Sequence, residues 1–174
     1  MRIGDKIIDF KLPGVDGKVY SLSSFDPKKP KAIIFWANHC PYVKAWEDRI
    51  IKLGKKYKDK VDFILISAND TTKYPEDSFE NMKKRAEEKG YPFPYLFDES
   101  QSVPKAYGAQ RTPEIFLFDS EGKLVYHGAP DDNWEDESKV KNHYFEDAIK
   151  SLLEGKKPEI QETPPVGCTI KWKS

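Results

Sequence analysis

Apolar residues follow two alternating patterns along the chain. Short runs rich in β-branched and aromatic residues predict strands buried on both faces, at 32–36, 61–66 and 95–97. Segments in which apolar residues recur at spacings of three and four predict amphipathic helices, at 41–60, 77–89, 102–107 and 144–153. This alternation of strands and helices predicts a mainly parallel sheet joined by right-handed crossovers.

Two further pairs of short strands are separated by turn residues. Segments 7–12 and 19–22 flank Pro-Gly and Asp-Gly pairs and predict an N-terminal β-hairpin. Segments 114–119 and 123–127 flank Ser120-Glu121-Gly122 and predict a second hairpin at one edge of the sheet. The predicted fold is therefore α/β, with a central mixed sheet, an N-terminal hairpin, an antiparallel edge hairpin and flanking helices.

The chain divides into one domain and a tail. Residues 1–155 contain all the predicted elements, and a chain of 174 residues is long enough for one domain with a proper core. Residues 156–174 are irregular and contain several prolines, which favour extended backbone. We expect them to form an extended C-terminal tail that packs on the same domain.

Composition narrows the choice of partners. The chain has 29 Lys plus Arg and 29 Asp plus Glu, and no basic patch interleaved with aromatic residues predicts nucleic-acid binding. No apolar run is long enough to span a bilayer and residues 1–9 contain no apolar leader, so we expect a cytoplasmic protein without a membrane partner. Two cysteines in a reducing compartment are more typically catalytic or inert than a disulfide scaffold, and nothing in the sequence indicates a cofactor.

Cys40 lies where a predicted buried strand ends and a predicted helix begins. Pro41 suits the first helical position, because its missing N–H would have no partner there. The unpaired N–H groups and the partial positive charge of a helix N-terminus favour a thiolate, which is the nucleophilic form of cysteine. Cys40 is therefore a candidate nucleophile, and the alternative is a buried structural cysteine.

Acidic residues elsewhere are assigned to local structure. Asp77 with Glu80 is read as a capping box at the start of the second helix. The run Asp131-Asp132-Asn133 is interpreted as a solvated turn rather than a loop over the site. His127 and His143 are expected to be structural or exposed.

Several motifs together resemble a known superfamily. They are Phe35-Trp36-Ala37-Asn38-His39-Cys40-Pro41-Tyr42-Val43, Thr112-Pro113, Phe118-Asp119 with Gly122-Lys123, 129–134 and Pro165-Val166-Gly167-Cys168. With these motifs the chain resembles the thioredoxin superfamily, and within it the peroxiredoxin-like, redoxin-type branch. The resemblance covers nearly the whole chain and implies a thioredoxin-like fold with a cis peptide bond between Thr112 and Pro113.

The resemblance also implies a function and a set of site residues. Cys40 would be the redox nucleophile of a thiol-disulfide oxidoreductase or a thiol-dependent antioxidant protein. The site around it would be shaped by Trp36, Asn38, His39, Pro41, Arg111, Thr112 and Pro113. Arg111 and His39 would stabilise the thiolate, although each could equally be a solvated surface residue.

Three positions depart from the patterns of this superfamily. The second cysteine of the thioredoxin motif is replaced by Val43. The proline and threonine that precede the reactive cysteine of peroxiredoxins are replaced by Ile33 and Ala37. The usual peroxide-activating hydroxyl is therefore missing.

Cys168 is the candidate resolving thiol for Cys40. It is the only other cysteine, and residues 155–168 reach at most ~40–45 Å when extended, which exceeds the height of a domain this size. Two alternatives remain open: a tail that only packs Val166, Ile170 and Trp172 on the body, and a pairing between subunits.

The expected partners are a thiol or disulfide protein substrate or a small oxidant, together with an external thiol reductant. Two other enzyme or binding roles stay open, a thiol peroxidase proper and a non-enzymatic adaptor that holds peptides in the groove of a thioredoxin fold. A metal site formed by Cys40, Cys168 and a histidine is not supported by any pair of ligands at metal-binding spacing, so we expect no metal.

Overall fold

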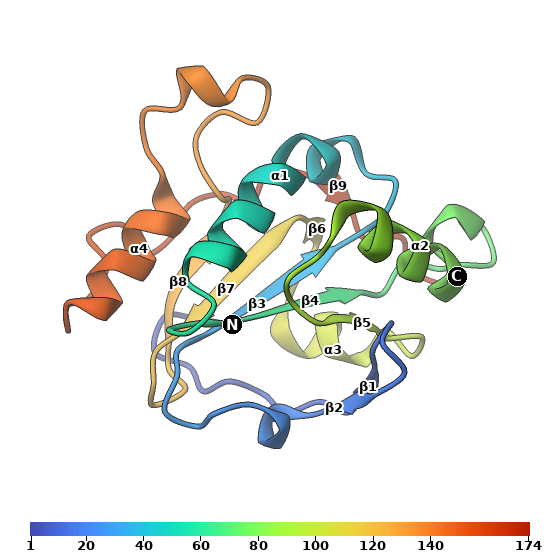
Figure 1. The fold of residues 1–174 in the computed structure, drawn as a ribbon, viewed down its shortest axis with the longest axis horizontal. Coiled ribbons are helices and arrows are strands. Elements are labelled where there is room, and N and C mark those ends of the chain that lie inside the picture. The colour runs from blue at the N-terminus through green and yellow to red at the C-terminus, as the bar shows by residue number, and fades with distance from the viewer.

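A five-stranded mixed sheet forms the centre of the computed structural model, which describes all residues 1–174 (Figure 1). Its strand order is β5-β4-β3-β7-β8. The strands are β3 (Lys31–Trp36), β4 (Asp62–Ser67), β5 (Tyr95–Phe97), β7 (Glu114–Phe118) and β8 (Leu124–Gly128). β3, β4 and β5 are parallel, whereas β7 and β8 form an antiparallel hairpin at one edge. The predicted central mixed sheet with its edge hairpin is confirmed.

Helices cover both faces of this sheet. They are α1 (Pro41–Lys56), α2 (Phe79–Lys89), α3 (Ser102–Tyr107) and α4 (Tyr144–Leu153). None of them combines the length and the apolar character needed to cross a membrane. The element order along the chain alternates strand and helix from β3 to α3, as the hydrophobic pattern predicts.

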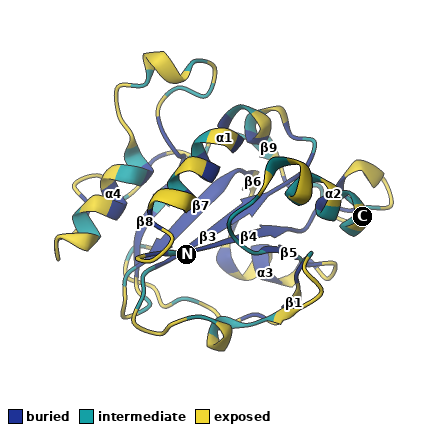
Figure 2. Cartoon of the chain, viewed as in Figure 1, coloured by how far each residue is buried: buried dark blue, intermediate teal, exposed yellow.

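Side chains of β3 alternate between two cores. Ala32, Ile34 and Trp36 pack in a core that also contains residues of α1, α2 and α4. Ile33 and Phe35 pack in a second core together with residues of α3 and of the N-terminal segment. Every residue of β3 is buried, and Figure 2 shows the central strands in dark blue. Helices on one face and α3 with the N-terminal segment on the other explain why this strand is a continuous apolar run.

The N-terminal hairpin is shorter than its sequence predicts. It consists of β1 (Leu12–Pro13) and β2 (Val19–Tyr20). The residues before β1 pair elsewhere, because the N–H of Ile7 donates to the carbonyl of Gly122 at 2.7 Å and a backbone bridge joins Lys6 to Lys123. The expected strand over 7–12 is therefore wrong in extent, since its first residues extend the edge hairpin instead.

The second helix is capped by a different residue from the one predicted. α2 begins after Ser78, whose hydroxyl accepts a hydrogen bond from the N–H of Asn81 at 3.2 Å. Asp77 lies in the short 3₁₀ helix η2 (Pro75–Asp77) and is fully buried. The capping box of Asp77 with Glu80 is therefore wrong, and the buried carboxylate has another role. Two other 3₁₀ turns, η1 (Leu22–Ser24) and η3 (Glu137–Lys139), lie in connections.

Residues 156–174 run across the molecule from α4 to the opposite side, where the C-terminus lies (Figure 1). Midway they form β9 (Cys168–Thr169), which pairs antiparallel with β6 (Arg111–Thr112) in a separate two-stranded sheet. Upstream, the N–H of Thr163 donates to the carbonyl of His127 at 3.0 Å. The tail is thus extended, and backbone pairing fixes it to the body.

Gly128 allows this close approach of the tail to β8. Its φ is +152°, and a Cβ there would lie 2.0 Å from Thr163 Oγ1 and 2.6 Å from the Thr163 carbonyl. We expect Gly128→Ala to lower the free energy of unfolding by roughly 2–5 kcal/mol, because strained backbone and overpacking both contribute. Urea unfolding measures this loss.

Gly155→Ala is the matched control. Gly155 has φ +75° and no atom within 4 Å of the added Cβ. This variant carries only the cost of a left-handed residue, ~1–2 kcal/mol. Equal losses in the two variants would mean that contact with Thr163 does not matter.

Candidate functional site

Cys40 is the N-cap residue of α1, directly after the loop that follows β3. Its φ and ψ are −65° and 126°, and Pro41 occupies the first helical position. The Cys40 carbonyl accepts the N–H of Lys44 at 2.9 Å, so the backbone begins the helix while the side chain makes no capping bond. Because the side chain does not cap the helix, the sulfur is free to contact other elements.

The sulfur of Cys40 faces the sulfur of Cys168. The two Sγ atoms lie 2.6 Å apart, and Cys40 Sγ lies 3.3 Å from the carbonyl oxygen of Thr112. Both residues are free thiols, Cys40 is 1% exposed and Cys168 is partly exposed. The tail carries Cys168 to Cys40 within one chain, as its length permits.

The peptide bond between Thr112 and Pro113 is cis, as predicted. In the pairing of β6 with β9, Thr112 lies opposite Cys168. The Thr112 carbonyl is therefore close to both thiols, and the Thr112 side chain is buried without a hydrogen-bond partner for its hydroxyl.

A buried carboxylate holds the backbone before the cis bond. Glu114 is 2% exposed, and its Oε1 accepts the N–H groups of Gln110 and Arg111, each at 2.9 Å. Its Oε2 lies 2.6 Å from Nε2 of His127, which is thereby structural, as expected. Glu114 thus fixes β6, the strand that the tail pairs with.

A second buried carboxylate holds the loop before Cys40. Asp77 Oδ1 accepts the backbone N–H groups of Asn38 at 2.8 Å and His39 at 3.3 Å. Its Oδ2 accepts Nδ2 of Asn69 at 2.8 Å and lies 2.6 Å from Nδ1 of His39. Asp77 therefore sets the path of the two residues that lead into Cys40.

Asn38 and His39 are anchored by their side chains as well. The Asn38 amide accepts the hydroxyl of Tyr95 at 2.7 Å and donates to the Glu76 carbonyl at 3.1 Å. The His39 ring stacks on Tyr74 with 5.9 Å between ring centroids. These contacts make the loop before the cysteine a rigid part of the body.

Trp36 belongs to the core beneath the site. It is 1% exposed, and its indole N–H donates to the hydroxyl of Tyr91 at 3.1 Å. That hydroxyl donates to Glu47, whose carboxylate also accepts two bonds from Arg85. Trp36 is thus a core residue held by this buried network, and its role in shaping the site stays a prediction.

Arg111 contacts the tail. Its side chain is exposed, and Nη1 donates to the Gly167 carbonyl at 3.3 Å. It makes no hydrogen bond to either sulfur. The guanidinium thus ties the tail to β6, and its effect on the Cys40 thiolate stays a prediction.

The acidic run after β8 is a clamped loop, and its interpretation as a solvated turn is wrong. Asp131 is buried and forms a two-point ion pair with Arg49 Nη1, at 2.9 and 3.1 Å. Arg49 also donates to the carbonyls of Asn133 and Trp134. Trp134 then packs on Tyr42 of α1, with 4.4 Å between ring centroids.

The two thiols differ in their surroundings. Burial, and next the hydrogen bond with Cys40, raise the pKa of the Cys168 thiol from 9.0 to about 11, and the charge of Cys40 acts in the same direction. The backbone N–H of Tyr42 and the charge of Lys171 oppose this shift but are weaker. Cys168 therefore keeps its proton at neutral pH.

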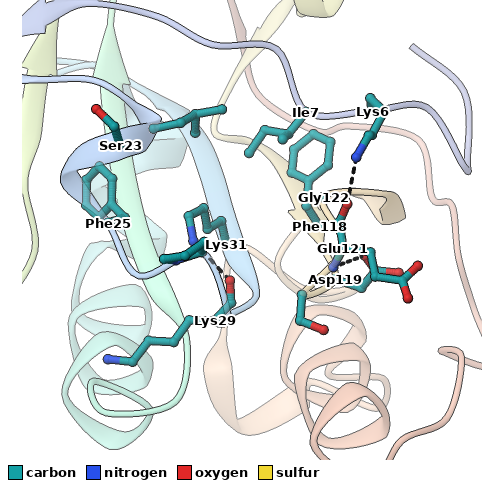
Figure 3. A pocket seen from close by; sticks show the side chains of 13 residues that line it. Lys6, Ile7, Ser23, Phe25, Lys29, Lys31, Phe118, Asp119, Glu121 and Gly122 are labelled. Carbon is teal, nitrogen blue, oxygen red and sulfur yellow. Dashed lines mark hydrogen bonds between the residues drawn. The ribbon is translucent and has the colours of Figure 1, made fainter.

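A cavity of about 530 Å³ lies at the other end of the sheet, where β3 starts and β7 ends (Figure 3). Two of the three lysines that line it are partnered: Lys31 Nζ donates to the Asp26 and Lys29 carbonyls, and Lys6 Nζ donates to the Glu121 carbonyl. No group of three or more His, Cys, Asp or Glu side chains in the chain is arranged to hold a metal ion.

Three residues of this site were not assigned to it from the sequence: Asp77, Glu114 and Gly167. Asp77 is followed by Ser78, and both residue types can cap the second helix. Because one cap is enough, the other side chain was available for a different role. Glu114 is a lone charge at the start of a buried apolar strand, which signals a partnered carboxylate. Gly167 directly precedes Cys168, and a glycine beside a functional residue can mark a close backbone approach.

Comparisons with known proteins find chains of similar overall structure. An uncharacterized conserved protein of Geobacillus kaustophilus has a similar structure, with 42% identity, a TM-score of 0.93 and coverage of 99% of this chain and 93% of that chain. A hypothetical protein of Sinorhizobium meliloti is 35% identical with a TM-score of 0.94, over 100% of this chain and 96% of that chain. No curated protein sequence matches the chain.

A more distant structure is the exposed lipoprotein thioredoxin of Streptococcus pneumoniae. It is 30% identical with a TM-score of 0.59, over 69% of this chain and 87% of that chain. The sequence profile of the Redoxin family matches residues 2–144, which include Cys40 and the cis bond. The chain belongs to the Redoxin family of the thioredoxin superfamily.

Proposed function

We propose that this chain is a thiol-disulfide oxidoreductase, or a thiol-dependent antioxidant protein, that cycles between a dithiol and a Cys40–Cys168 disulfide. The observation that carries the proposal is the 2.6 Å separation of the two sulfurs at the N-terminus of α1. Cys40 is the nucleophile, because it occupies the N-cap position of α1 and its free sulfur lies in the favourable field of the helix dipole. Cys168 is the resolving thiol.

With a disulfide substrate the cycle has two exchange steps. The Cys40 thiolate attacks one sulfur of the substrate, the substrate S–S bond breaks, and the other half leaves as a thiolate. Cys168, after losing its proton to solvent, attacks Cys40 Sγ and displaces the bound half as a second thiolate. The protein is oxidised by two electrons and the substrate disulfide is reduced to two thiols.

With a peroxide substrate the same thiols react through a sulfenic acid. The Cys40 thiolate attacks one peroxide oxygen, the O–O bond breaks, and the other oxygen leaves as an alcohol or water after taking a proton. Cys168 then attacks the Cys40 sulfur, and water leaves as the disulfide forms. Ala37 is buried and has no hydroxyl to activate peroxide, so the disulfide route is favoured and a thiol peroxidase proper is the second reading.

The pKa of Cys168 suits the order of these steps. Part of the increase in this pKa comes from the hydrogen bond and the charge of Cys40. Both contributions end when Cys40 is bonded to substrate or oxygen. Cys168 therefore stays protonated and inert until Cys40 has reacted, and then ionises more readily.

An external thiol reductant closes the cycle. Its thiolate attacks the disulfide, and a second thiol releases it as a disulfide, so that two electrons return to the protein. We place the cycle in the cytoplasm, where such reductants are abundant. Asn38, His39, Pro41, Thr112 and Pro113 position the two thiols in this proposal.

Replacing each cysteine separates the two roles. With a small peroxide or a small disulfide, we expect Cys40→Ser to abolish turnover at saturating external thiol. Cys168→Ser should still allow the first step, so intact-mass spectrometry should find sulfenic acid or a mixed disulfide on Cys40. Wild type under the same treatment should lose two hydrogens and contain neither adduct.

The opposite pattern would overturn the assignment. Activity retained in Cys40→Ser, or an unchanged Cys40 thiol after oxidation of the Cys168→Ser variant, would remove Cys40 as the nucleophile. A wild-type adduct that persists on Cys40 with Cys168 free would remove Cys168 as the resolving thiol.

The raised pKa of Cys168 predicts a dependence of stability on pH. A thiol whose pKa rises on folding stabilises the protein fully below its unfolded pKa and loses this contribution as pH rises through the folded value. For the reduced protein we expect the loss between pH 9 and about 11, relative to Cys168→Ser. Urea unfolding in the presence of a non-thiol reductant measures this loss of stability. Parallel pH profiles for the two proteins would contradict the link between the pKa of Cys168 and folding stability.

A further inference from the structure

We propose that the segment Val166–Lys171 acts as a built-in substrate strand, which restricts the oxidants of Cys40 to small molecules. This inference rests on the proposed function and specifies its substrate class. It starts from the edge of β6, which the tail occupies, rather than from the cysteine chemistry itself.

The tail pairs with β6 as an extended peptide would. Thr112 lies opposite Cys168 and Arg111 lies opposite Thr169. The N–H of Ile170 donates to the Gln110 carbonyl at 2.9 Å, which continues the pairing past β6. An exposed strand edge binds extended peptides through such backbone bonds, whatever their sequence. Two chains cannot pair with the same edge at once.

Cys168 occupies the position that the cysteine of a bound peptide would need. The pairing register places it opposite Thr112, and its sulfur lies 2.6 Å from Cys40 Sγ. A protein disulfide must bring its own sulfur to this point for in-line attack by Cys40. With the tail in place, Cys40 is 1% exposed, so a disulfide held in a folded protein does not reach it.

Anchors beyond Cys168 keep the tail in this position. Ile170 is 4% exposed and packs in the core on the α3 side of the sheet. The N–H of Lys171 donates to Asn69 Oδ1 at 2.9 Å, and the Lys171 carbonyl accepts from the N–H of Asp70 at 2.8 Å and from Gln101 Nε2 at 2.9 Å. A competing peptide would have to replace these bonds as well as the pairing with β6.

Gly167 makes the close approach possible and supplies the test. A Cβ at this residue would lie 2.1 Å from the Thr112 carbonyl oxygen and 3.2 Å from the Pro113 nitrogen. Both contacts are backbone atoms, and φ at Gly167 is outside the region that favours glycine. Gly167→Ala therefore adds no backbone strain of its own, but it forces the tail away from β6.

The probe is a synthetic peptide with the sequence of residues 163–173, because this sequence fits the β6 edge. Its cysteine is joined to 5-thio-2-nitrobenzoate, and the matched small oxidant is free cysteine joined to the same group. In both, Cys40 thiolate attacks the cysteine sulfur and the coloured thiolate leaves. The measured quantity is the ratio of the two first-step rate constants, peptide to cysteine, with the Cys40→Ser rates subtracted.

In wild type we expect the peptide conjugate to react more slowly than the cysteine conjugate by at least about tenfold, which corresponds to one or two backbone hydrogen bonds. Gly167→Ala should raise the ratio by a similar factor. Ile170→Ala weakens the packing of the tail in the core and leaves Gly167 unchanged, so it should raise the ratio as well. This second variant replaces Gly167→Ala in the test if Gly167→Ala does not fold. Glu159→Ala, at an exposed side chain outside this segment, should leave the ratio unchanged.

A ratio near one in wild type, or a ratio that neither variant raises, would overturn the proposal. Failure of the proposed function gives a different result: Cys40→Ser would then release the coloured thiolate as fast as wild type. In that case the built-in strand can still be tested without cysteine chemistry. A fluorescent version of the peptide with serine at position 168 is titrated with protein, and fluorescence anisotropy measures its binding. Binding that Gly167→Ala does not strengthen over wild type would overturn the built-in strand, and stronger binding would support it.

Discussion

The pairing of Thr112 with Cys168 is the contact on which the arrangement of the site depends. It joins the residue before the cis bond to the tail, and it places the two sulfurs 2.6 Å apart. Gly167 permits it, because any side chain there would meet the Thr112 carbonyl. Helix α1 supplies one thiol at its N-terminus, and the tail supplies the other through a strand that the domain itself binds.

Two buried carboxylates make that contact possible. A carboxylate out of water is costly unless hydrogen bonds replace its solvation. Asp77 and Glu114 each obtain these bonds from consecutive backbone N–H groups, in the loop before Cys40 and in β6. Each also lies 2.6 Å from a histidine nitrogen. Hydrogen bonds to these carboxylates thereby fix the two backbone segments on either side of the thiols, the loop before Cys40 and β6.

How far the sequence predicts this structure depends on the range of the interactions involved. Hydrophobic periodicity predicted the central sheet and its helices, because those patterns are local. Asp77 was misassigned because the backbone groups that it holds, those of Asn38 and His39, lie nearly forty residues away, and a cap next to Ser78 satisfied every local rule. Asp131 was misassigned for the same reason, since Arg49 is on another element. The length of the tail allowed Cys168 to reach Cys40, but only the structure shows that it does so as a paired strand.

In the proposed cycle, one edge of β6 must serve both the resolving step and any protein substrate. A thiol fixed 2.6 Å from its target reacts without paying the entropy of encounter, so a docked tail favours fast resolution. The same docking leaves no backbone groups of Thr112 free to bind another chain. A tail held loosely would admit protein disulfides but would resolve them slowly. The contacts of Ile170, of the Lys171 backbone and of Gly167 hold this tail tightly, which is why we propose small oxidants as the substrates.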